Sequence, residues 1–128
     1  MSTYNEELQN SNAQISNMIT LANSLPDAAP DYATIVDVAV SSTLDTTNGG
    51  RFIRCVNSSA ITITIPAGLD VGVEIEVCRF GAGTVTFAAA TDVTINSVDG
   101  ALTIANQYGV AVLKQVATNV WLLAGDLG

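Results

Sequence analysis

The stretch "LDVGVEIEVCRF", residues 69–80, decides the fold class of this chain. From Val71 to Val77 every second residue is apolar, while Glu74 and Glu76 occupy places between them. Successive side chains of a β-strand point to opposite faces, so this alternation predicts a strand with one buried face and one solvated face.

Comparable short runs precede and follow this strand. They are "ATIVDVAV", "RFIRCV", "AITITIP", "TVTFAA", "DVTINSV", "ALTI", "YGVAVLKQV" and "NVWLLAG". About nine short strands, separated by turn signals roughly every 8 to 12 residues, predict a mainly β fold. We expect residues 32–128 to form an antiparallel β-sandwich or jelly-roll-like domain. No internal repeat is evident in this region.

Residues 1–25 follow a helical period instead. Thr3 and Glu6 match the T-x-x-E capping box of a helix start, and Pro26 ends the pattern. Apolar residues recur at alternating spacings of three and four, which is the pattern of a coiled-coil seam. The residues that we expect at oligomeric contacts are Tyr4, Leu8, Ile15, Met18, Ile19, Ala22 and Leu25. The sequence therefore predicts an N-terminal helix that forms a short coiled coil.

A proline-rich stretch, "PDAAPD" at residues 26–31, predicts a stiff linker between the helix and the β-domain. The helix could instead fold back as a lid or insert into a pocket of a partner. The linker and the regular spacing favour self-association. The seam does not fix the number of helices, but Ser11 and Met18 at d positions, with Ile19 and Leu21 beside them, allow a three-stranded contact.

Charged residues are scarce, at 12% of the 128 residues, and the formal net charge is −8. The four cations, Arg51, Arg54, Arg79 and Lys114, are scattered along the chain. Binding to nucleic acid or to an anionic membrane needs clustered cations, so we expect neither partner.

The chain shows no signal-peptide pattern, and its apolar runs are shorter than the roughly 18 residues of a membrane span. We therefore expect a cytosolic origin. Cys55 and Cys78 fit that compartment as two buried, reduced thiols rather than a disulfide.

Histidine is absent, which removes the usual acid–base residue and most zinc sites. The remaining enzymatic hypothesis is a carboxylate pair acting on a carbohydrate, with Glu74, Glu76, Asp92 and Asp99 as candidates by residue type alone. Each of them sits at a turn or on the polar face of a strand, where a solvated carboxylate is the default interpretation. We expect no enzymatic activity, no cofactor and no metal.

Two further features have a structural and a functional interpretation. "GAGTV", residues 81–85, resembles a phosphate loop, but a strand rather than a helix follows it, so Gly81 and Gly83 are predicted to be turn residues with positive φ. Trp121 could be a platform for a sugar, but its place in "NVWLLAG" favours the core.

Several motifs of the second half resemble a β-domain of tailed-bacteriophage virion proteins. The matching segments are Thr64-Ile65-Pro66, Gly72 to Val77, Gly81 to Phe87, Gln107 to Leu113, and Trp121 to Leu127, which carries the closing W-x-L-x-G-D-L. The resemblance covers roughly residues 35–128, and the opening "YNEELQ…LPDA" is similar to short virion proteins as well. It implies a structural role on a virus particle, as a homotrimer, without catalytic residues.

The length of the predicted helix helps to choose between the head and the tail of such a particle. A helix of roughly 22 residues spans at most about 33 Å, which is short for a receptor-binding shaft. We therefore expect a capsid decoration or head-fibre protein on the virion surface, attached through its N-terminal region to the major capsid protein. The alternative is a tail-associated short fibre, adaptor or baseplate protein that contacts tail proteins and a host surface glycan.

Overall fold

The computed structural model describes residues 32–128, so the predicted helix, its seven contact residues and the linker lie outside the described residues. The described part is mainly β, as predicted. Its strands are β1 (Ile35–Val38), β2 (Ser42–Thr43), β3 (Phe52–Cys55), β4 (Ile61–Ile65), β5 (Glu74–Arg79), β6 (Val85–Ala89), β7 (Thr94–Ser97), β8 (Val110–Ala117) and β9 (Val120–Gly125). Two short 3-10 turns, η1 (Thr46–Asn48) and η2 (Val98–Gly100), complete the elements.

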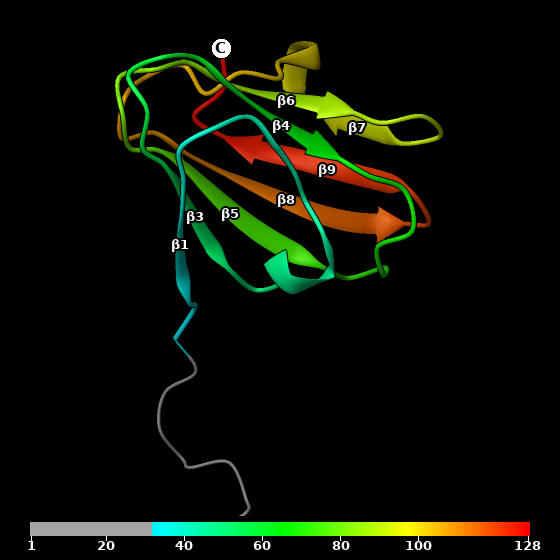
Figure 1. Ribbon diagram of the computed structural model, residues 1–128. Coiled ribbons are helices and arrows are strands. Elements are labelled where there is room, and N and C mark those ends of the chain that lie inside the picture. The colour runs from blue at the N-terminus through cyan, green and yellow to red at the C-terminus, as the bar shows by residue number, and fades with distance from the viewer. Residues whose placement is uncertain (1–31) are drawn as a thin grey trace, which may run out of the picture. The chain divides into compact units, whose positions relative to one another are not determined.

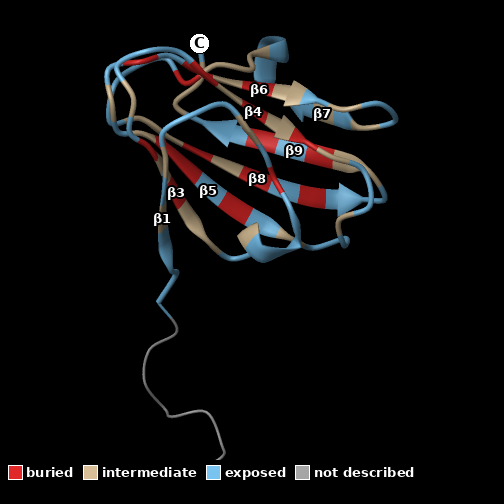
Figure 2. Ribbon diagram, in the orientation of Figure 1, coloured by how far each residue is buried: buried red, intermediate tan, exposed pale blue. Residues whose placement is uncertain are grey.

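The strands form two sheets that enclose one core (Figure 1). Six strands form one sheet in the order β1-β3-β5-β8-β9-β7, and three form the other in the order β2-β4-β6. Burial alternates along β4 and β5, so each strand turns one row of side chains inward (Figure 2). The inward rows of both sheets, including Ile53, Ile75, Ile63 and Phe87, meet in a single apolar cluster.

The prediction of an antiparallel domain is wrong for most strand pairs. Five of the seven pairs within residues 32–128 are parallel, and only the β5–β8 and β8–β9 pairs are antiparallel. From β1 to β6 the chain alternates between the sheets, adding one strand to each sheet in turn. Two neighbouring strands of one sheet can be parallel with only short loops, because the chain runs back between them as a strand of the opposite sheet. The first three turns of the chain are therefore stacked coils.

The second and third coils pair their strands at one constant offset in residue number. Phe52 pairs with Glu76 and Ile61 pairs with Val85, so both sheets place residues 24 positions apart side by side. Among the four register pairs of β3–β5 and the five of β4–β6, only Thr62 and Thr86 are identical. The preceding pairs have other offsets, 17 for Ile35 with Phe52 and 21 for Ser42 with Ile63, so the coils share no fixed period. The expectation that no internal repeat is evident therefore stands.

Gly81 and Gly83 lie at a corner where one coil rests on the preceding one. Their N–H groups donate to the carbonyl oxygens of Cys55 and Asn57 at 2.8 and 2.9 Å. Neither glycine has the positive φ that the sequence predicted. Glycine is needed here for a different reason, because a Cβ on Gly83 would lie 2.5 Å from the carbonyl carbon of Ser59.

Two buried residues mark the end of the core near β8 and β9. Trp121 is fully buried, which confirms that it belongs to the core rather than to an exposed sugar platform. Gln115, its register partner, is the one polar residue that is fully buried among residues 32–128. Within the same residues, no helix has the length and apolar character needed to traverse a lipid bilayer.

Candidate functional site

The four candidate carboxylates lie in two regions, and the two of β5 line one small pocket of about 180 Å³ together with Arg51. Glu74 and Glu76 point outward from β5, and Glu74 lies 3.7 Å from the ammonium group of Lys114. Asp92 and Asp99 lie in the turns before and after β7, both with positive φ. Residues 32–128 contain no group of three or more His, Cys, Asp or Glu side chains that could hold a metal ion.

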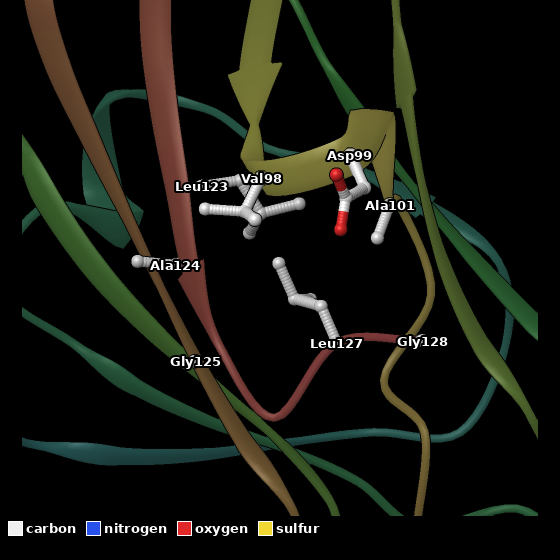
Figure 3. Close-up of a pocket in the computed structure, with 8 residues that line it drawn as sticks. All are labelled: Val98, Asp99, Ala101, Leu123, Ala124, Gly125, Leu127 and Gly128. Carbon is white, nitrogen blue, oxygen red and sulfur yellow. The ribbon is translucent and has the colours of Figure 1, made fainter.

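One pocket, of about 590 Å³, lies between η2 and the end of the chain (Figure 3). Its walls are mainly apolar, and the carboxylate of Asp99 is its one charged side chain. The lining residues are Val98, Asp99, Ala101, Leu123, Ala124, Gly125, Leu127 and Gly128. Acid–base chemistry on a glycoside needs two carboxyl groups across the scissile bond, and this pocket offers a single side-chain carboxylate.

A second feature, on the outer face of the larger sheet, has more varied chemistry. Asp37 on β1 accepts two hydrogen bonds from the guanidinium of Arg54 on β3, at 2.6 and 3.0 Å. The same guanidinium lies 5.0 Å from the ring centroid of Phe80, directly after β5. Tyr108, before β8, meets Phe80 edge to face at 5.7 Å between centroids. We call Asp37, Arg54, Phe80 and Tyr108 the aromatic–arginine cluster.

The register of the sheet explains why these residues meet. Asp37, Arg54 and Cys78 are consecutive register partners across β1, β3 and β5, so their side chains share one face. Cys78 is only 5% exposed although it stands on an outer face. Phe80, two residues further along the chain, and Tyr108 supply the aromatic part of the cluster.

Arg79 fixes the loop that carries Tyr108. Its guanidinium donates to the carbonyl oxygens of Ile104 and Ala105 at 3.3 and 3.1 Å, and to that of Ala82 at 2.7 Å. The N–H of Tyr108 donates to the carbonyl oxygen of Arg79 at 2.6 Å. The loop is therefore tied to the end of β5 by charge-assisted hydrogen bonds, which are stronger than neutral ones.

The electrostatics of the cluster are those of a neutralised pair. The hydrogen bonds with Asp37 raise the pKa of Arg54, so the guanidinium stays charged. Burial raises the pKa of the Cys78 thiol, and the positive charge of Arg54 partly opposes that rise. Because the cation and the carboxylate of the pair cancel, the exposed cluster carries no net charge.

Both cysteines are buried and free, as the sequence predicted. Cys55 faces the core from β3, where burial raises the pKa of its thiol from 9.0 to about 11. The register pairs Cys55 with Arg79 and Cys78 with Arg54, so the thiols belong to opposite faces of the sheet. Neither thiol is placed as a nucleophile, because a reactive cysteine needs a lowered pKa and access to solvent.

The sequence did not reveal the aromatic–arginine cluster. Arg54 was read as one of four scattered cations, and Tyr108 as part of a strand motif. The four members lie at positions 37, 54, 80 and 108, and a parallel register brings the first two together. The local signal that was available is the pair of aromatic residues at strand ends, and it is weak without the topology.

A comparison of the chain with known protein-family models and with curated proteins finds no match. The resemblance to phage virion proteins therefore stays a prediction from the motifs.

Proposed function

We propose that this chain is a non-enzymatic structural protein of a bacteriophage virion, a homotrimeric capsid decoration or head-fibre protein attached through its N-terminal region. The observation that carries the proposal is that the segment with the phage-like motifs and the folded β unit have nearly the same boundaries. The motifs that resemble phage virion proteins extend over roughly residues 35–128, and the compact β unit extends over Ala33–Gly128. The resemblance thus covers one complete folded body.

The surface of that body supports a passive role. The outer positions of β4 and β6 are Thr62, Thr64, Thr86 and Ala88, none of them charged. The stacked coils are tied together by corner hydrogen bonds such as that from the Asn57 side chain to the carbonyl oxygen of Ala39, at 2.7 Å. A rigid body with a sparsely charged surface suits repeated packing on a shell.

Particle location tests the proposal directly. An antibody against the chain, applied to intact particles and viewed by electron microscopy, should label the head, and a particle reconstruction should show threefold density there. Sedimentation of the purified chain at micromolar concentration should give a trimer. A monomer in solution, together with unlabelled particles, would overturn the proposal.

A specific observation favours the tail-associated alternative as well. Tyr108 is 66% exposed and Phe80 is 43% exposed, beside a folded core that could have buried them. Exposed, fixed aromatic residues next to an arginine are the composition of recognition hot spots. A short tail fibre or adaptor that contacts a host glycan would use such a surface, and label on the tail rather than the head would favour it.

A further inference from the structure

Tyr108 adopts a backbone conformation that is unfavourable for a residue with a bulky side chain. Its φ is +68°, in the left-handed region. The other non-glycine residues with positive φ within residues 32–128 are Asp92, Asp99 and Asn119, residue types that tolerate this region. Glycine or asparagine would fit position 108 with less strain. Strain of this kind persists where the surroundings enforce it, and it concentrates at functional sites.

The surroundings hold the ring of Tyr108 in place without burying it. Arg79 fixes the preceding loop through the carbonyl oxygens of Ile104 and Ala105, and the side-chain amide of Gln107 donates to the carbonyl oxygen of Phe80 at 3.2 Å. The ring meets Phe80 at an interplanar angle of 82°. Because the edge of one ring meets the face of the other, the two rings form an angular surface instead of a flat stack. Such preorganisation lowers the entropic cost of binding.

Beside the rings stands a paired donor and acceptor. Asp37 engages Nε and one terminal nitrogen of Arg54. The guanidinium has further N–H donors, and the carboxylate oxygens have further lone pairs. Their side chains are 34% and 50% exposed, so both groups remain accessible to a ligand. Since their charges cancel, the pair suits an uncharged polar ligand better than an anion or a cation.

We propose that the aromatic–arginine cluster binds an uncharged saccharide. A pyranose ring has an apolar C–H face and a rim of hydroxyl groups. The C–H face would stack on Tyr108, whose π face is weakly negative. Hydroxyls of a neighbouring sugar unit would donate to Asp37 and accept from Arg54, because β1 and β8 lie three strand spacings apart, about 14 Å, which is more than one ring spans. Only an uncharged sugar uses both halves of the cluster without leaving a charge unpaired.

This inference deepens the tail-associated form of the proposed function, on which it rests for the source of the sugar, a glycan of the bacterial surface. Binding itself requires neither the trimer nor a particular place on the virion. Its failure is therefore separable from failure of the proposed function, which particle labelling and sedimentation decide.

The experiment uses the purified full-length chain and an array of neutral oligosaccharides built from glucose, galactose, mannose and N-acetylglucosamine. Sialylated and sulfated glycans serve as charged comparisons. Saturable binding of at least one neutral saccharide is expected, and calorimetry then measures its affinity. Tyr108→Asn should weaken that binding about tenfold or more, as loss of a central aromatic contact commonly does.

The choice of variant separates recognition from folding. Asparagine tolerates a positive φ, so Tyr108→Asn should melt no lower than the parent chain. Tyr108→Phe keeps the ring and should retain most of the affinity. Arg54→Lys keeps the charge but loses the planar fork and should weaken binding. Tyr32, which is 81% exposed and outside the cluster, provides the matched control, and Tyr32→Ala should leave binding unchanged.

Four results would overturn the proposal. The first is an array on which no neutral saccharide binds, and the second is binding that Tyr108→Asn leaves unchanged. The third is a preference for the charged glycans over the neutral ones. If Tyr108→Asn instead abolishes attachment of the chain to purified virion proteins, the cluster is a protein contact and the saccharide assignment is wrong.

Discussion

Replacing Gly83 with alanine should strongly destabilise the β-domain, because the stacked coils leave no room for a side chain at that corner. A Cβ on residue 83 would lie 2.5 Å from the carbonyl carbon of Ser59 and 2.8 Å from the carbonyl oxygen of Asn57. Both neighbours are backbone atoms, which cannot swing aside as the end of a flexible side chain can. The two coils would have to separate locally.

The magnitude follows from two terms. Separation breaks the hydrogen bond from the N–H of Gly83 to the carbonyl oxygen of Asn57, 2.9 Å long, which contributes about 1 kcal/mol. Overpacking against rigid neighbours adds about 1–3 kcal/mol. The free energy of unfolding should therefore fall by about 2–4 kcal/mol. With an unfolding entropy of about 0.2 kcal/mol/K for roughly 100 residues, the melting temperature should fall by about 10–20 °C.

Gly49→Ala supplies the matched control. Gly49 has φ −56°, and a Cβ there would make ordinary contact with Val73 at 3.7 Å. Removing a glycine at such a compatible site should raise stability by about 0.4–1 kcal/mol. Both variants are compared with the parent chain by calorimetry at one fixed protein concentration, since association shifts melting temperatures. If Gly83→Ala melts within about 2 °C of the parent chain, the coils do not stack in the register described.

Three further changes probe other parts of the molecule. Burial raises the pKa of the Cys55 thiol in the folded state to about 11, from the ordinary value of 9.0. The contribution of Cys55 to the free energy of unfolding is therefore constant below pH 9 and is lost as the pH rises towards 11. The free energy of unfolding should fall by up to about 1.4 kcal/mol per pH unit in that window, and urea titrations of Cys55→Ala should lack this part of the slope. Arg79→Met removes the donors to the carbonyl oxygens of Ile104, Ala105 and Ala82 and should lower the free energy of unfolding by about 2–3 kcal/mol in denaturant titrations. Hydrogen exchange should become faster in residues 105–109, and unchanged exchange would show that this loop is held by other contacts. If the chain is the proposed trimer, Ile15→Asp should convert it to a monomer in sedimentation at micromolar concentration, while the circular dichroism of the β-domain persists. A variant that still sediments as a trimer would show that the N-terminal segment is not the assembly element.

The sequence predicted the mainly β character and much of the core because alternation of apolar and polar residues depends only on strand geometry. The alternation around Ile75 and Val77 placed both in the interior, and Trp121 followed from its position in a terminal strand. The buried, free state of Cys55 and Cys78 was also predicted, because unpaired cysteines are among the most buried residues and stay reduced in the cytosol. These are local properties, and local patterns report them well.

The aromatic–arginine cluster could not be predicted in the same way. Its members come from four segments far apart in the chain, and none of the segments has a recognisable motif for ligand binding. Arg54 meets Asp37 because β1 and β3 run parallel in one particular register. A shift of one residue would turn one of the two strands' side chains to the opposite face and separate the pair.

The sequence by itself therefore determined most of the strands and the inward direction of Ile75 and Val77. It placed Val71 on the buried face, where the structure leaves it 58% exposed, and it missed the short strand β2. The predicted strand "ALTI" forms only isolated bridges. Only the tertiary structure decided that β5 lies parallel to β3 and antiparallel to β8. The period of two is the same in both arrangements, so it carries no information about direction. Direction depends on whether the chain returns within its own sheet or through the opposite one. Here the backbone passes close enough at Gly81 and Gly83 for each coil to rest on the one before it, and that contact exists only once the whole domain is folded.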